Sequence, residues 1–188
     1  MKRAFIIHGW GGEPTSNWHP WLKKELERNN FEVEVPTMPN TDAPEMESWV
    51  EKLIETVGKA DEETYFIGHS IGCQTILRYF EDLKFKVGGA VFVAGWFTLN
   101  LETEEEKKIA KPWLDNKINF DKVKKNCNRI VAIFSDNDPF VDLEENKLAF
   151  EKLNAEIIVE KNKGHFDDES KTTKLPSALK AVLKLAGE

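Results

Sequence analysis

The sequence has few cysteines and no long apolar segment. Its 2 cysteines, Cys73 and Cys127, lie far apart without paired metal-ligand spacing, so we expect reduced thiols, no disulfide framework and no metal site. No run approaches the roughly 18 apolar residues that a membrane span requires, and Ala4–Ile7 is too short for the apolar part of a signal peptide. These absences favour a cytoplasmic protein that does not enter a membrane.

The chain also lacks an excess of basic residues and the composition of a disordered protein. Its 26 Lys and Arg residues are outnumbered by 33 Asp and Glu residues, which gives a net charge of −7 and no evident basic patch. A phosphate backbone would be repelled, so nucleic acid is not an expected partner. With 40% apolar residues and only 11 Gly and 8 Pro, we expect one folded domain over residues 1–188.

Short apolar runs rich in β-branched and aromatic residues alternate with helical patterns along the whole chain. Because a parallel connection needs a crossover that a helix fills, this alternation predicts a parallel sheet between helices. We therefore predict an α/β fold, a three-layer sandwich with about six parallel strands. The expected strands are Ala4–His8, Phe31–Val35, Thr64–Ile67, Val87–Ala94, Arg129–Phe134 and Ala155–Val159.

Apolar residues at helical spacing place helices between these strands. Asp42 and Glu45 match a capping box before the clearest helix, and Gly58 matches its C-terminal stop. The segment 97–126 is longer than one crossover helix requires. Its acidic start is interpreted as a solvated helical turn, which we favour, or as a flap over the site. The other expected helices are Trp18–Arg28, Ile71–Leu83, Phe120–Lys125, Asp142–Leu153 and a last one that contains Leu175 and Leu183.

Gly68-His69-Ser70-Ile71-Gly72 lies directly after a predicted strand and before a helical pattern, which is typical of a nucleophile elbow. In such an elbow the serine occupies a strained turn, and the positions two before and two after it have no room for a β-carbon. Ser70 is therefore the candidate nucleophile. The alternative is an ordinary glycine-rich turn at a helix N-terminus.

A serine hydroxyl is a weak nucleophile and needs a base. Of the 4 histidines, only His165 follows the elbow, which agrees with the chain order serine, acid, histidine. His165 is therefore the candidate base. His69 is too close to Ser70 in sequence to turn back onto its hydroxyl, and His8 and His19 precede the nucleophile.

The acid that orients the base is expected after the penultimate strand, where the sequence is Ser135-Asp136-Asn137-Asp138-Pro139. Asp136 is able to form an Asx-type turn, whereas Pro139 keeps the residue before it extended. We favour Asp138 as the acid over Asp136. Glu160, at the end of the last strand, is a poorer alternative.

Negative charge that develops on a substrate oxygen requires N–H donors fixed in advance. The backbone N–H of Ile71 follows the nucleophile, and the glycine-rich loop His8–Gly12 offers the amide of Trp10 as a second donor. Aromatic residues near the same edge of the sheet are candidate walls of an apolar substrate pocket, and a place in the core is the alternative for each. They are Trp10, Trp96, Phe97 and Trp113.

Several short segments occur in a distinctive order: HGWGG at 8–12, WHPWLKKEL at 18–26, TMPN at 37–40, GHSIG at 68–72, KPW at 111–113, SDNDPFV at 135–141 and GHF at 164–166. With these, the chain resembles the small serine hydrolases of the retinoblastoma-binding protein 9 and YdeN type over about residues 4–185. The resemblance implies a reduced α/β-hydrolase fold with a six-stranded parallel sheet. It also implies Ser70 as nucleophile, Asp138 as acid and His165 as base.

Animal members of this family are associated with binding of the retinoblastoma protein through a Leu-x-Cys-x-Glu motif. Neither Cys73 nor Cys127 has a leucine two positions before it and a glutamate two positions after it, so that partner is not expected. We predict a cofactor-independent, carboxylesterase-like serine hydrolase for small acyl esters, with amides and thioesters as further substrates. The alternatives are a non-catalytic interaction scaffold on the same fold and an acyltransferase.

Overall fold

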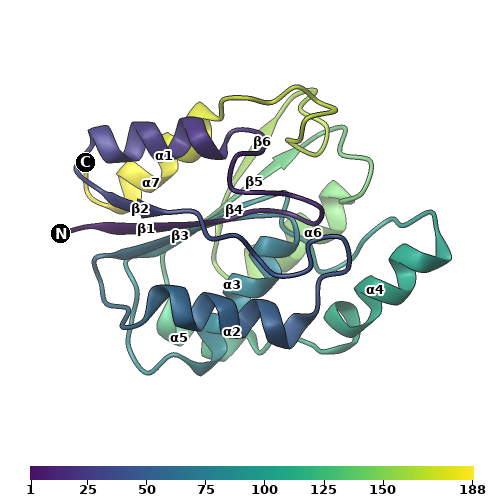
Figure 1. Ribbon diagram of the computed structural model, residues 1–188, viewed down its shortest axis with the longest axis horizontal. Helices are drawn as coiled ribbons and strands as arrows, with labels where there is room; N and C mark the ends of the chain where they lie inside the picture. The colour runs from purple at the N-terminus through teal and green to yellow at the C-terminus, as the bar shows by residue number, and fades with distance from the viewer.

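The computed structural model describes residues 1–188 as a parallel sheet with helices on both faces (Figure 1). The strands are β1 (Arg3–Ile7), β2 (Glu32–Glu34), β3 (Thr64–His69), β4 (Gly89–Val93), β5 (Ile130–Ser135) and β6 (Glu156–Glu160). Their order across the sheet is β2-β1-β3-β4-β5-β6, and every neighbouring pair is parallel. The predicted three-layer α/β fold is therefore confirmed.

Helices cover both faces of the sheet and form its outer layers. α1 and α7 pack on one face, and α2, α3, α5 and α6 lie on the other (Figure 1). α4 projects away from the sheet at the end of the molecule opposite the chain termini (Figure 1). The bounds are α1 (His19–Arg28), α2 (Met46–Val57), α3 (Ile71–Asp82), α4 (Glu104–Asp115), α5 (Phe120–Asn126), α6 (Leu143–Lys152) and α7 (Pro176–Leu185).

The centre of the sheet is the centre of the core. Every residue of β3, β4 and β5 is buried, because helices cover both faces of these strands, as is usual in parallel sheets. The edge strands β2 and β6 are more exposed. The apolar runs of the sequence are therefore continuous in the central strands, where both faces must be apolar.

The strand order places several loops at one edge of the sheet. From β1 the chain adds β2 on one side and β3 on the other, so the direction of winding reverses at β1. In open parallel sheets, ligands bind outside the carboxyl ends of the strands near such a reversal. The loops that follow β1, β3, β4, β5 and β6 therefore converge on the expected location of a site.

All six expected strands are present within two residues of their predicted ends, and the expected helices are present as well. The capping box at Asp42 and Glu45 is wrong. Glu45 is the N-cap of α2 and makes no side-chain cap bond, while the backbone oxygen of Asp42 accepts a hydrogen bond from the indole of Trp10. Gly58 does end α2, with φ 61°. The acidic segment is α4, whose capping box is Thr103 and Glu106.

The two chain termini lie close together, away from the loops that follow the strands (Figure 1). The side chains of Lys2 and Glu188 form an ion pair. None of the helices combines the length and the apolar character that crossing a membrane requires.

Candidate active site

Ser70 occupies the turn between β3 and α3 in a strained conformation, with φ 53° and ψ −119°. A different close contact excludes a side chain at each of the two flanking glycines. A β-carbon on Gly68 would lie 2.8 Å from backbone atoms of Cys73 in α3, and one on Gly72 would lie 2.3 Å from the carbonyl oxygen of Ile7 in β1. Gly72 therefore lets α3 approach the neighbouring strand, which is a closer constraint than the turn alone imposes.

His165 and Asp138 meet across the loops that follow β6 and β5. His165 Nδ1 lies 2.8 Å from Asp138 Oδ2, and their side chains are 12% and 2% exposed. The other oxygen, Oδ1, accepts hydrogen bonds from the backbone N–H groups of Phe140 and Val141 at 2.9 and 3.1 Å. A carboxylate only accepts, so Nδ1 carries the proton and Nε2 is left with a free lone pair.

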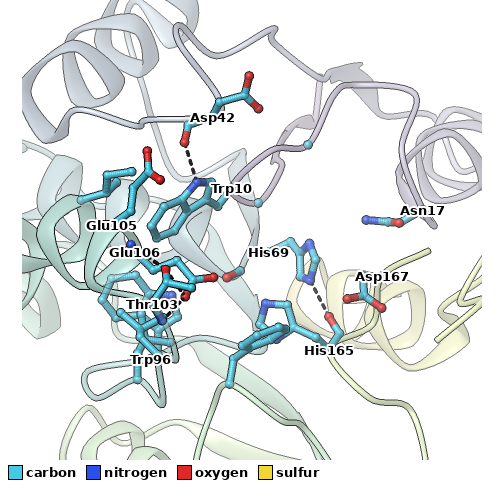
Figure 2. Close-up of a pocket in the computed structure, with 17 residues that line it drawn as sticks. Trp10, Asn17, Asp42, His69, Trp96, Thr103, Glu105, Glu106, His165 and Asp167 are labelled. Carbon is cyan, nitrogen blue, oxygen red and sulfur yellow. Dashed lines mark hydrogen bonds between the residues drawn. The ribbon is translucent and has the colours of Figure 1, made fainter. Parts of the chain in front are cut away.

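Ser70 and His165 line the same cavity of about 480 Å³. This volume falls within the usual range for small-molecule sites. No hydrogen bond joins the Ser70 hydroxyl to another group of the chain, and none joins it to His165. Figure 2 shows the cavity with the side chains that line it.

The loop before His165 is bound to the loop before Asp138 by side chains that accept from its backbone. Asp136 Oδ1 accepts from the N–H of Asn162 at 2.7 Å, and Asn137 Oδ1 accepts from that of Gly164 at 2.8 Å. A third bond runs from the N–H of Lys163 to Ser135 Oγ at 2.9 Å. Asp136, the alternative acid, thus holds the loop that carries His165, and Asp138 is the aspartate that reaches its ring.

The loop after β1 is also fixed by bonds to a neighbouring loop. Gly11 N–H donates to the oxygen of Thr41 at 2.8 Å, and the Trp10 indole donates to that of Asp42 at 2.9 Å. The backbone N–H of Trp10 makes no hydrogen bond within the chain. Ile71 is the first residue of α3, where backbone N–H groups have no acceptor in a preceding turn. Both expected oxyanion donors are therefore free to bind a ligand.

Three further histidines lie buried near this loop, and none takes the position of a base. His8 accepts from the N–H of Met38 at 3.2 Å, and burial lowers its pKa. His19 is fully buried and both ring nitrogens lack a partner; burial lowers its pKa well below the usual value. Burial and the nearby His165 lower the pKa of His69 to about 4. These rings are neutral at pH 7.

Two of the four aromatic residues expected in the pocket lie on its wall. Trp10 and Trp96 line the cavity, whereas Phe97 and Trp113 do not. Phe97 packs against the rings of Phe120 and Phe150 instead. Trp113, in the last turns of α4, is buried and donates from its indole to the oxygen of Pro44 at 3.0 Å. Trp113 therefore anchors α4. The sequence pattern alone does not distinguish this role from a place in the pocket wall.

Most of the other wall of the cavity is formed by residues that no sequence motif indicates. The start of α4 and the segment before it contribute Leu99, Leu101, Thr103, Glu105, Glu106 and Ile109. The acidic stretch is therefore both exposed and part of the site, and the length of 97–126 was its only signal. The residues that line the cavity include Asp42, Glu105, Glu106 and Asp167 and no Lys or Arg; Asp42 turns its backbone oxygen towards Trp10 and its carboxylate away (Figure 2). No group of three or more His, Cys, Asp or Glu side chains lies in a metal-binding arrangement.

Comparison with known proteins agrees with this architecture. The chain is 29% identical to the YdeN protein of Bacillus subtilis over 93% of this chain and 91% of that protein. It is also 29% identical to the serine hydrolase RBBP9 of Rattus norvegicus, over 88% of each chain. The crystal structure of the Bacillus subtilis ydeN gene product superposes with a TM-score of 0.91 at 26% identity and covers 100% of both chains.

A more distant neighbour has the same fold. Est1E from Butyrivibrio proteoclasticus, in a structure with ferulic acid bound, has a TM-score of 0.75 at 14% identity, with 100% of this chain and 90% of that chain covered. A family model described as serine hydrolase matches residues 4–184. Because that match spans nearly the whole chain, this protein belongs to the serine hydrolase family.

Proposed function

We propose that this protein hydrolyses small acyl esters through Ser70, His165 and Asp138, and that amides and thioesters are further substrates of the same site. The observation that carries the proposal is the pairing of His165 Nδ1 with Asp138 Oδ2 at 2.8 Å. This pairing leaves Nε2 as a proton acceptor on the wall of the cavity into which the elbow presents Ser70.

In the first half of the proposed reaction, the oxygen of Ser70 bonds to the acyl carbon while its proton passes to His165 Nε2. Asp138 accepts from Nδ1–H and stabilises the imidazolium that results. The carbonyl oxygen becomes an oxyanion and is bound by the N–H groups of Trp10 and Ile71. When the tetrahedral species collapses, the bond to the leaving alcohol breaks and the alcohol takes the proton from His165.

In the second half, water attacks the acyl-serine and gives a proton to His165 Nε2. Collapse releases the carboxylic acid and returns the proton to the Ser70 oxygen. The same base serves both halves, so no cofactor is required by this chemistry. The ferulic acid bound to the distant neighbour Est1E supports an acyl group as the ligand of such a cavity.

A fluorophosphonate probe tests this proposal. We expect one probe per chain, attached to Ser70, with labelling lost in Ser70→Ala and in His165→Ala. Hydrolysis of p-nitrophenyl esters of graded acyl length should be lost in the same two variants. An inert Ser70 in a folded protein would contradict the proposal and favour an interaction scaffold, and product analysis with added alcohols would identify acyl transfer.

A further inference from the structure

The loop that carries His165 is held on its carbonyl side by two side chains from distant parts of the sequence. His69 Nε2 lies 2.7 Å from the backbone oxygen of His165, a contact that Figure 2 shows. The indole Nε1 of Trp18 donates to the next backbone oxygen, that of Phe166, at 3.1 Å. Two consecutive carbonyl groups are therefore bound by two N–H donors.

We propose that His69 and Trp18 form a carbonyl clamp that positions His165 for catalysis. Their role depends on the proposed function, because they act on the base of that reaction. Both are positioning residues: each acts through the backbone of the base loop rather than on the reacting atoms. The turn of the GHSIG motif requires its glycines and its serine for steric reasons. It does not require a histidine before the serine, so His69 has another role.

The loop that carries His165 needs such a clamp because its backbone is strained directly after the base. Gly164 has φ 52°, which glycine adopts freely, whereas Phe166 has φ 57°. Phe166 is a bulky residue in a left-handed conformation that side chains disfavour, and it is fully buried. Such conformations persist only where the surroundings determine them. The clamp supplies this constraint by binding the backbone oxygens of His165 and Phe166.

The chemistry of His69 makes it a donor of one defined proton. A carbonyl oxygen only accepts, so Nε2 carries the hydrogen, and Nδ1 is a lone pair that is buried without a partner. His69 is 3% exposed, and its low pKa keeps the ring neutral well into the acid range. The ring therefore has a single tautomer over the whole range in which a neutral base is needed.

Packing connects the two donors with each other and with the nucleophile. The ring centroid of His69 lies 5.2 Å from that of His165 and 5.9 Å from that of Trp18, which is fully buried. His69 is the last residue of β3 and directly precedes Ser70. His69 therefore contacts the backbone of the base and adjoins the nucleophile in sequence, so one side chain couples the positions of the two.

Four variants test the clamp. His69→Gln keeps an N–H donor at the end of the side chain, whereas His69→Leu removes it, and Trp18→Phe keeps a ring but removes the indole donor. Trp49→Phe is the matched control: Trp49 is equally buried and donates to the oxygen of Pro39 at 2.7 Å, and neither residue lines the cavity. We expect kcat to fall about 10- to 100-fold in His69→Leu and Trp18→Phe with KM little changed, because small displacements of a catalytic group have effects of this order.

In the same measurements, His69→Gln should recover most of the loss and Trp49→Phe should keep its kcat while losing thermal stability much as Trp18→Phe does. Equal kcat values for Trp18→Phe and Trp49→Phe would overturn the clamp, as would a His69→Leu protein with normal kcat. If His69→Leu does not fold, the comparison of kcat between Trp18→Phe and Trp49→Phe decides whether the clamp positions His165.

A spectroscopic measurement separates failure of the clamp from failure of the proposed function. The Nδ1–H proton of His165, bonded to Asp138, should give a downfield NMR signal that broadens in His69→Leu and Trp18→Phe and persists in His69→Gln. An unchanged signal in both donor-free variants would overturn the clamp whatever the activity. Full activity in Ser70→Ala would instead refute the proposed triad.

Discussion

The loops around Ser70 and His165 differ sharply from α4 on the opposite wall of the cavity. The elbow is fixed by backbone contacts too close for a β-carbon, and the base loop has side-chain partners on its N–H and carbonyl groups. The start of α4 is exposed, and the helix is anchored near its end by Trp113. Reacting groups require fixed geometry, whereas a wall that contacts the substrate tolerates adjustment.

The largest effect is expected at Asp138, the proposed acid, in the fixed loops around Ser70 and His165. In Asp138→Asn, an amide N–H would face His165 Nδ1 and force the other tautomer, so that Nε2 could no longer accept the Ser70 proton. We expect kcat to fall about 10⁴-fold, as for this change in other serine enzymes. Asp136→Asn is the control, since its amide oxygen can still accept from Asn162. Similar losses in both variants, measured by ester hydrolysis, would remove the distinction between the two aspartates.

A second comparison separates steric contact from backbone strain. Gly72→Ala places a β-carbon 2.3 Å from the oxygen of Ile7, so we expect a loss of at least about 3 kcal/mol in the free energy of unfolding. Gly58 has open space around it and φ 61°, ψ −117°, close to the values of Ser70. Gly58→Ala should cost about 1 to 2 kcal/mol, which is the strain alone.

Urea denaturation of the two glycine variants and the unchanged protein measures both costs. The second value also indicates the strain that Ser70 bears in the elbow. Equal losses in the two variants would show that the contact with β1 relaxes, and that the elbow is less rigid than its geometry indicates.

A third prediction concerns the loss of folding stability at acid pH, to which His69 contributes. The pKa of His69 is about 4 in the folded state, below the usual 6.5 of a histidine in water, so the unfolded chain binds a proton first as the pH falls. Stability should therefore decrease from about pH 6.5 towards pH 4, by up to about 3 kcal/mol from this residue. His8 and His19 act in the same direction.

The measurement is the free energy of unfolding of the unchanged protein and of His69→Gln at pH 7 and pH 4.5. The variant has no titrating ring at this position, so its stability should depend less on pH. If both proteins lose the same free energy between the two pH values, His69 does not contribute to acid lability.

The smallest effect is expected at the start of α4, which forms the exposed wall of the cavity. Because acidic residues and no Lys or Arg line the cavity, p-nitrophenyl succinate should be hydrolysed less efficiently than the uncharged p-nitrophenyl butyrate. Glu105→Gln should raise kcat/KM for the anionic ester about twofold, since exposed charges contribute less than about 1 kcal/mol. Glu104→Gln, at an exposed side chain outside the cavity, is the control. A change for the uncharged ester would point to a packing effect instead.

How far the sequence predicts the structure depends on whether a feature is local. The strands and the strand-to-helix turn at Ser70 follow from periodicity and a short motif, and they agree with the positions found. The roles of serine, acid and histidine also follow from short motifs and stay a prediction. Asp138 was preferred to Asp136 on local backbone grounds, but the bonds that distinguish them connect segments far apart in sequence. Local patterns carry no information about such partners.

The pocket wall was less predictable for the same reason. Trp113 and Trp96 have similar character in the sequence, and only the docking of α4 decides that one anchors a helix and the other faces the cavity. The partners of His69 and Trp18 are also distant, because they are backbone oxygens of residues 165 and 166. A backbone acceptor leaves no trace in the identity of the residue that provides it.

The adjacent ends of the chain make this protein suitable for attachment to a surface. Lys2 and Glu188 form an ion pair, and the chain ends lie at the opposite end of the molecule from α4, whose start lines the cavity (Figure 1), so a fusion partner or an immobilising tag at either end would leave substrate access open. Joined by a short linker, the same ends would also allow circular permutation, with new termini opened in an exposed loop far from the reacting groups.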